Sequence, residues 1–178
     1  MSKHTSRLSL LLIPILLLIL LLLLSACGSF ATPLPALDGT ESVPDITLPT
    51  PEGEMLSLSD YRGQVVFLNF WGTYCPPCVA ELPELQEVYG ELKDEGFVVI
   101  GLNAEEKPEK VTAFVEENGI AFPIIISDDA TINPVFGLKH MPSTWFIDKK
   151  GILRGKMEGQ MSKEMALKIA RKLLAEED

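Results

Sequence analysis

The stretch VVFLNFWGTYCPPC, residues 65–78, decides the fold of this 178-residue chain. Its first seven residues are almost continuously apolar, which is typical of a β-strand buried on both faces of a sheet. The two prolines suit the first turn of a helix, and Gly96 suits its end, so we expect a helix from Pro76 to about Glu95. Both cysteines of the stretch therefore lie where a buried strand passes into a helix.

Cys75 and Cys78 are three positions apart at this helix start, a spacing that can close a small disulfide ring. The partial positive charge and the unpaired N–H groups of a helix N-terminus stabilise a thiolate. We expect Cys75 to be the exposed nucleophile and Cys78, one turn further in, to be the resolving thiol. A purely structural disulfide has no reason to lie at this junction. A zinc site would need two more ligands, and the chain has no second cysteine pair, so we expect no metal.

The prolines between the cysteines bear on the direction of electron transfer. A thiolate at the helix start accepts hydrogen bonds from the N–H groups of the residues that follow it. Pro76 and Pro77 have no N–H group, so only Cys78 and later residues can donate. A less stabilised thiolate favours a reducing couple over an oxidising one.

The remaining pattern alternates strands and helices. Two strands flank a turn at residues 49–53, a second buried strand follows at 97–102, and Pro108 starts a helix that stops at Gly119. The chain then predicts a strand at 123–126, a hairpin over 144–156 and a final helix around residues 165–173. Strands joined by helices pair in parallel, and a terminal hairpin adds antiparallel strands. We therefore expect an α/β fold whose mixed central sheet has helices on both faces.

The N-terminus has the pattern of a secretory signal. Lys3 and Arg7 precede an apolar run from Leu8 to Leu24 that is slightly short for a membrane-spanning helix. The following Leu-Ser-Ala-Cys sequence resembles a bacterial lipobox, which implies cleavage before Cys27 and attachment of lipid to its sulfur. The alternative is an uncleaved signal anchor. Both alternatives place the C-terminal domain on the extracytoplasmic face of the cell membrane.

Three segments follow from these patterns. Residues 1–27 are the signal or anchor, residues 28–43 are a linker rich in proline and small residues, and residues 44–178 form the folded domain. The net charge of −10 at pH 7 argues against nucleic-acid binding, which usually requires a basic surface.

Several motifs together resemble a known family. Besides residues 69–78, they are Glu81, Pro83 and the downstream Met-Pro-Ser-Thr sequence at 141–144. The chain resembles the thioredoxin superfamily from about residue 43 to residue 174. More closely, it resembles the TlpA/ResA-type thiol–disulfide reductases, which are related to the AhpC/TSA proteins. This resemblance implies a thioredoxin-like fold with an added N-terminal β-hairpin. It also implies a cis bond between Met141 and Pro142 that faces the cysteines.

The resemblance also assigns roles to residues. Glu81 lies three residues after Cys78 on the same helical face, and the family has an acidic residue here that relays protons to the second cysteine. Shelter beside the thiols would raise the pKa of such a carboxyl group. The alternative role for Glu81 is to complement the helix dipole. The residues expected to shape the site or contact the substrate are Trp71, Tyr74, Pro76, Pro77, Met141 and Pro142.

The function implied is an extracytoplasmic thiol–disulfide oxidoreductase that reduces protein disulfides through Cys75 and Cys78. Its redox-active disulfide replaces any bound cofactor, and a membrane thiol carrier would return it to the reduced state. Apocytochrome c is the leading candidate substrate, and we expect the protein to be a monomer. We expect a reduction potential nearer that of thioredoxin, about −270 mV, than that of DsbA, about −120 mV.

Two other functions compete with this one. A peroxidase of the peroxiredoxin type needs a threonine three residues before its cysteine, whereas Thr73 is two residues before Cys75. A copper chaperone resembling the Sco proteins needs three residues between its cysteines, and this chain has two. A peroxide-consumption assay and a metal titration of the reduced protein would separate these alternatives from a reductase.

Overall fold

The computed structural model of the protein describes residues 35–127 and 129–176. The predicted signal, the predicted lipidation site at Cys27 and the first part of the predicted linker lie outside these residues. None of the helices in the described part of the chain has both the length and the apolar character needed to cross a membrane.

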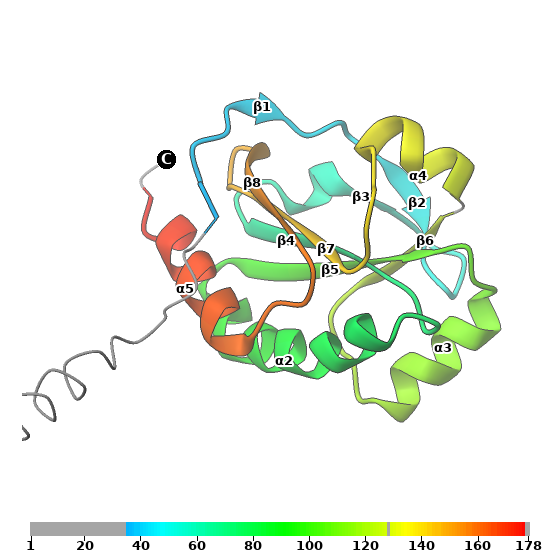
Figure 1. Ribbon diagram of the computed structural model, residues 1–178. Coiled ribbons are helices and arrows are strands. Elements are labelled where there is room, and N and C mark those ends of the chain that lie inside the picture. The colour runs from blue at the N-terminus through cyan, green and yellow to red at the C-terminus, as the bar shows by residue number, and fades with distance from the viewer. Residues whose placement is uncertain (1–34, 128, 177–178) are drawn as a thin grey trace, which may run out of the picture. The chain divides into compact units, whose positions relative to one another are not determined.

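A six-stranded mixed sheet forms the centre of the fold (Figure 1). Its strand order is β1-β8-β7-β4-β5-β6. Strands β4, β5 and β6 run parallel, and β1, β7 and β8 extend the sheet with antiparallel pairings. The strands are β1 (Glu41–Ser42), β4 (Val65–Trp71), β5 (Phe97–Ala104), β6 (Ile124–Ser127), β7 (Ser143–Ile147) and β8 (Ile152–Glu158). The mixed sheet predicted from the sequence is confirmed.

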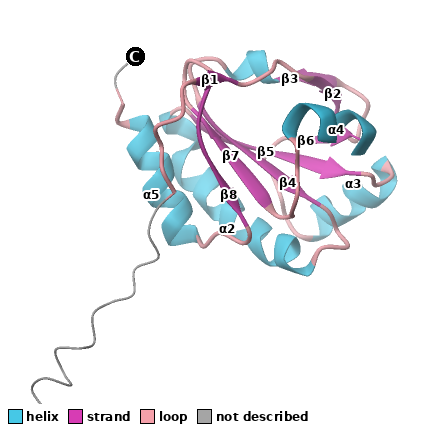
Figure 2. Cartoon of the chain, turned by 45° about the horizontal axis from the view of Figure 1, so that its top comes forward, coloured by secondary structure: helices cyan, strands magenta, loops and turns pink. Residues whose placement is uncertain are grey.

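Helices cover both faces of this sheet (Figures 1 and 2). One face carries α2 (Pro76–Leu92), α3 (Pro108–Glu117) and α5 (Lys163–Leu174), and the other carries α4 (Asp129–Phe136). Strand β4 is buried along its whole length, with Phe67 and Trp71 in the core under α2 and Leu68 and Phe70 in the core under α4. Complete burial of such a side chain contributes about 1.5–3 kcal/mol to folding. This explains the continuous apolar run in the sequence.

The predicted N-terminal hairpin is also confirmed. Strands β2 (Thr47–Pro49) and β3 (Met55–Ser57) pair antiparallel, with Leu48 opposite Leu56. A 3₁₀ turn, η1 (Leu58–Tyr61), leads from this hairpin toward β4. The hairpin packs on the same face of the sheet as α4.

The predicted limits of the active-site helix are close to those observed. Helix α2 continues through Pro83 to Leu92, and a 3₁₀ turn, η2 (Lys93–Glu95), completes the helical segment. Gly96 then takes the left-handed conformation, with a φ of 86°, which only glycine adopts without strain. Helix α4, which is short and has Pro134 inside it, was not predicted from the sequence.

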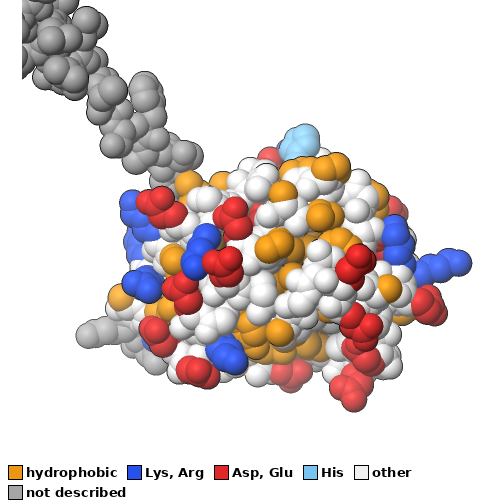
Figure 3. Space-filling model, turned by 90° about the horizontal axis from the view of Figure 1, so that it is seen from below, with side chains coloured by type: hydrophobic (Ala, Val, Ile, Leu, Met, Phe, Trp, Pro, Cys, Tyr) orange, Lys and Arg blue, Asp and Glu red, His pale blue; other side chains and the backbone are white. Residues whose placement is uncertain are grey.

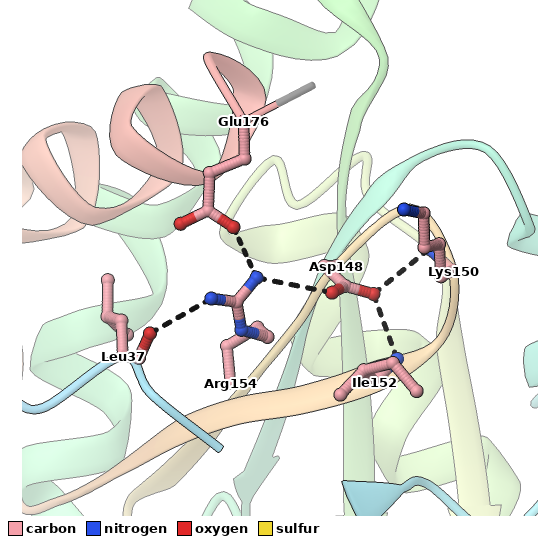
Figure 4. Close-up of polar contacts among 6 residues, drawn as sticks. All are labelled: Leu37, Asp148, Lys150, Ile152, Arg154 and Glu176. Atoms are coloured by element: carbon pink, nitrogen blue, oxygen red, sulfur yellow. Dashed lines mark hydrogen bonds and ion pairs between the residues drawn. The ribbon is translucent and has the colours of Figure 1, made fainter. Parts of the chain in front are cut away.

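The predicted linker is wrong for its last residues. Within residues 28–43, Leu37 and Val43 are buried, and β1 pairs with β8. The side chain of Arg154 on β8 fixes this segment, because its guanidinium donates to the carbonyl of Leu37 and also pairs with Asp148 and Glu176 (Figure 4). The segment was predicted as a linker because its proline and small residues show no periodic apolar pattern. Two isolated apolar side chains, Leu37 and Val43, are nevertheless enough to attach it to the domain.

Candidate active site

The two cysteines form a disulfide at the point where β4 gives way to α2. The S–S distance is 2.09 Å, and Cys75 is the N-cap residue of the helix. Cys75 is 9% exposed and Cys78 is 1% exposed. The order of exposure expected for an attacking and a resolving thiol is therefore present, although Cys75 is more enclosed in this oxidised state than the sequence suggested. Pro76 and Pro77 are both exposed at the helix start.

A carboxylate from another part of the chain fixes the loop before the disulfide. Glu106, which lies between β5 and α3, accepts hydrogen bonds from the backbone N–H of Thr73 at 2.6 Å and from the Thr73 hydroxyl. It also accepts from the side-chain amide of Asn103 and pairs with Lys110. Because Thr73 is two residues before Cys75, this contact positions the loop that carries the nucleophile.

The four donors around Glu106 favour its ionised form. Partial burial acts to raise the pKa of Glu106, but the hydrogen bonds from Lys110, Thr73 and Asn103 outweigh it and lower the pKa to about 2. Glu106 was not predicted from the sequence. The available signal was its place four residues after a predicted buried strand, because the carboxyl ends of neighbouring parallel strands share one edge of a sheet.

Glu81 lies one helical turn beyond Cys78 and has no exposed surface. Its Oε1 accepts a hydrogen bond from Nδ2 of Asn69 at 2.6 Å, and its Oε2 accepts from the backbone N–H of Met161. The same Nδ2 atom of Asn69 donates to the hydroxyl of Thr144 at 2.9 Å. Residues from β4, α2 and β7, together with the segment before α5, therefore meet at one buried carboxyl group.

Burial raises the pKa of Glu81 to about 7. The hydrogen bonds from Met161 and Asn69 lower it, and the charge of Glu84 raises it, but loss of solvation is the largest effect. A carboxyl group with this pKa exchanges its proton near neutral pH, which suits a general base or acid. The shelter of the Glu81 carboxyl group expected from the sequence is confirmed by its complete burial.

The loop containing Pro142 lies beside the end of β4 because β7 runs antiparallel to that strand. Phe70 of β4 is opposite Ser143 of β7, which places Pro142 at the edge of the sheet where the disulfide loop begins. The Met141–Pro142 bond is cis, as the family resemblance implied. The carbonyl of Pro142 accepts a hydrogen bond from the N–H of Gly159, which ties this loop to the end of β8.

The residues expected to contact substrate differ in exposure. Tyr74 is 53% exposed, and its ring folds over Gly72, where a Cβ atom would lie 2.7 Å from the ring. Met141 is half-buried and Pro142 is buried. Trp71 has no exposed surface and packs against Phe114, so it belongs to the core beneath the site and shapes the site from below.

The surface on the side of α2 and α3 is partly apolar. Exposed apolar side chains gather across the middle of this face, and charged side chains lie mostly around them (Figure 3). A surface of this kind can accept the apolar side chains of another protein.

A dithiol at a strand-to-helix junction beside a cis-proline loop defines a thiol–disulfide oxidoreductase of the thioredoxin superfamily. The chain belongs to the AhpC/TSA family, whose model matches residues 40–156, and within the superfamily it is of the ResA type.

Relatives and solved structures agree with this placement. The chain is 35% identical to the thiol–disulfide oxidoreductase ResA of Geobacillus thermodenitrificans over 91% of this chain and 93% of the relative. It is 40% identical to ResA of Halalkalibacterium halodurans, over 64% of this chain and 65% of that protein. A crystal structure of a thiol:disulfide interchange protein of the thioredoxin family from Chlorobium tepidum matches with a TM-score of 0.71 and 25% identity. That match covers 76% of this chain and 97% of the other.

Proposed function

We propose that the protein reduces disulfide bonds in other proteins, with Cys75 as the attacking thiol and Cys78 as the resolving thiol. The observation that carries this proposal is the position of Cys75 at the N-cap of α2, with the more deeply buried Cys78 one turn behind it. The Cys75 thiolate attacks a substrate sulfur, forms a mixed disulfide and releases one substrate thiolate. The Cys78 thiolate then attacks Cys75, forms the internal disulfide and releases the second substrate thiolate. Two electrons pass from the dithiol to the substrate.

Glu81 supplies the proton acceptor that this second step needs. Cys78 is almost completely buried, so no bulk water is at hand to remove its proton. Glu81 lies three residues further along the same helix and is poised to change its ionisation near neutral pH. The proton therefore passes from the Cys78 thiol to the Glu81 carboxylate as the resolving thiolate forms.

The substrate-facing surface combines Tyr74, Pro76 and Pro77 with the loop of Met141 and Pro142. The first three are exposed at the start of α2, and the loop lies beside the same end of β4. Apolar and aromatic side chains around a reactive thiol favour a segment of protein chain as the substrate over a small polar disulfide.

The cellular setting of the proposal rests on the sequence. The basic and apolar N-terminus with its Leu-Ser-Ala-Cys sequence supports attachment to the extracytoplasmic face of the membrane, through lipid on Cys27 or an uncleaved anchor. In such an oxidising compartment a reductase must be re-reduced, and a membrane thiol carrier would do so. Apocytochrome c, which must present two reduced cysteines to haem, is the proposed substrate.

Trapping of mixed disulfides tests these assignments. In a Cys78→Ser variant of the full-length protein the resolving step is blocked, so substrates should stay bound to Cys75 and be identified by mass spectrometry. A Cys75→Ser variant is the matched control and should trap little or nothing. If the Cys75→Ser protein trapped substrates and the Cys78→Ser protein did not, the roles of the two thiols would be reversed. If neither variant trapped a protein, a protein-disulfide substrate would be excluded.

A further inference from the structure

Asn69 has one polar atom without a partner in a fully buried position. Its side chain lies between Glu81 and Thr144, and Nδ2 donates to Oε1 of Glu81 and to the hydroxyl of Thr144. Its Oδ1 has no hydrogen-bond partner among the described residues. An unpaired buried carbonyl oxygen is destabilising, so a native protein rarely keeps one without a reason.

The arrangement fits only one of the two protonation states of Glu81. When Glu81 is ionised, both of its oxygens accept, one from Asn69 and one from the N–H of Met161. When Glu81 gains a proton, one oxygen must donate instead. The N–H of Met161 cannot accept that hydrogen bond. The proton must therefore lie on Oε1, where it faces the donor hydrogens of Asn69.

Inversion of the Asn69 amide removes the clash of donors at Oε1 and moves the unpaired position of the amide from Oδ1 to Nδ2. A half-turn about the terminal torsion exchanges Nδ2 and Oδ1, which are nearly equal in shape. Oδ1 then accepts from the protonated Oε1 of Glu81, and the separation of 2.6 Å suits an O–H···O hydrogen bond. The hydroxyl of Thr144, which can both accept and donate, turns to donate to the same Oδ1 atom.

Among the groups that surround Glu81, the Asn69 amide is the one whose hydrogen bonding must change when Glu81 gains a proton. On α2, Glu81 neighbours Cys78 and Glu84, and the negative charge of Glu84 favours its protonated form. Strands β4 and β7 contribute Asn69 and Thr144, which do not titrate, and the segment before α5 contributes only the Met161 N–H. The ammonium group of Lys163 on α5 is already paired with Glu87 and Glu91.

We propose that Asn69 is a positioning residue whose side-chain amide inverts when Glu81 gains or loses its proton, and that Thr144 carries this change to the substrate-facing loop. Thr144 is two residues after Pro142, so the hydrogen-bond chain from Glu81 through Asn69 ends next to that loop. The inference rests on the proposed role of Glu81. When Cys78 passes its proton to Glu81, the hydrogen bonds from Glu81 through Asn69 to Thr144 reverse their donor and acceptor roles. The hydrogen bonding next to the loop of Met141 and Pro142 therefore changes as the substrate is released.

NMR of the oxidised full-length protein tests this inference between pH 5 and 9. The side-chain amide protons of Asn69 should shift upfield as the pH falls, because they lose a charged acceptor. The pH midpoint of this shift should equal the pH midpoint of the Glu81 carboxyl-carbon signal. Asn103 is a matched internal control. It also donates to a carboxylate, Glu106, but that carboxylate stays ionised throughout this range, so the Asn103 signals should not move.

Two variants of Thr144 test the link to the loop. The backbone N–H of Ser143 should titrate with the Glu81 midpoint in the native protein and in Thr144→Ser, which keeps the hydroxyl. It should not titrate in Thr144→Val. If Glu81 titrates and the Asn69 amide does not follow it, the inference is overturned and the proposed function stands. If the Glu81 carboxyl carbon shows no titration in this range, the proposed proton relay itself fails.

Discussion

Glu106 accepts hydrogen bonds from both the backbone N–H and the hydroxyl of Thr73, which is 33 residues away in the sequence and two residues before Cys75. Glu106 follows the end of β5 and Thr73 follows the end of β4, and these two strands are parallel neighbours in the sheet. Their contact ties the loop before the disulfide to the loop before α3. The position of the proposed nucleophile therefore depends on a carboxylate outside the Cys-Pro-Pro-Cys sequence.

Substitution of Glu106 by alanine should weaken this support. Glu106→Ala leaves the N–H and hydroxyl of Thr73 without their acceptor, which should lower the free energy of unfolding by about 1–3 kcal/mol and slow disulfide reduction. Urea unfolding at pH 7 measures the first effect. Glu117→Ala, at an exposed position on α3, is the control and should change little. Equal unfolding free energies for the two variants would show that Glu106 does not support the loop.

Substitution of Glu81 by glutamine should remove part of the pH dependence of stability. The folded-state pKa of about 7 is above the ordinary value of 4.5, so the folded protein keeps a proton that the unfolded chain loses. The contribution of Glu81 to stability is therefore greatest below pH 4.5 and falls by about 3 kcal/mol as the pH rises to 7. Urea unfolding of the oxidised protein from pH 4.5 to 8 should show this slope, and Glu81→Gln should not. A native slope retained in the variant would contradict the raised pKa.

The same variant tests the proposed proton relay. Release of the mixed disulfide should accelerate as the pH rises through about 7 in the native protein, because only ionised Glu81 can accept the proton of Cys78. Stopped-flow measurements with a disulfide peptide should show a weaker pH dependence in Glu81→Gln. An unchanged profile would exclude Glu81 as the general base.

Restoring a backbone donor at the helix start should make the couple more oxidising. An N-cap side chain accepts from the second or third residue of the helix, here Pro77 and Cys78. Pro77→Ala adds an N–H group where it can reach the Cys75 thiolate, so the reduction potential should rise. Pro76→Ala adds one at the first helical position and is the matched control with a smaller effect. Equilibration with glutathione measures both, and a rise confined to Pro76→Ala would contradict the explanation.

Loss of the exposed aromatic ring before Cys75 should affect protein substrates selectively. Tyr74→Ala removes apolar contact area, so the KM for a disulfide-containing peptide should rise about 5-fold, which corresponds to about 1 kcal/mol. The rate with a small aromatic disulfide should change much less. A uniform loss with both substrates would indicate a damaged active site and no direct substrate contact.

The sequence predicted those parts of the fold that depend on local pattern. The apolar run at 65–71, the prolines that start α2 and α3, and Gly96 after the helical segment each have a signal within a few residues. Glu81 was selected because the family resemblance places an acidic residue there, and its spacing from Cys78 puts it on the same face of the helix. The cis state of the Met141–Pro142 bond came from the family resemblance, since the residues themselves allow either isomer.

The parts that were missed depend on contacts between distant segments. Glu106 stands beside other charged residues, a pattern equally typical of a solvated loop, and only the pairing of β4 with β5 brings it to Thr73. The hydrogen bond from Met161 to Glu81 joins residues 80 positions apart. The pairing of β1 with β8 involves only two residues of each strand, too few for an alternating pattern in the sequence.

The central claim, that the Cys75–Cys78 pair works as a reductant, is tested most directly by its equilibrium reduction potential. The measurement equilibrates the full-length protein with glutathione or dithiothreitol buffers at pH 7 and quantifies the free thiols. We predict a value near that of thioredoxin, about −270 mV. A value above that of protein disulfide isomerase, about −180 mV, would show that the protein is an oxidant or an isomerase and would contradict the account.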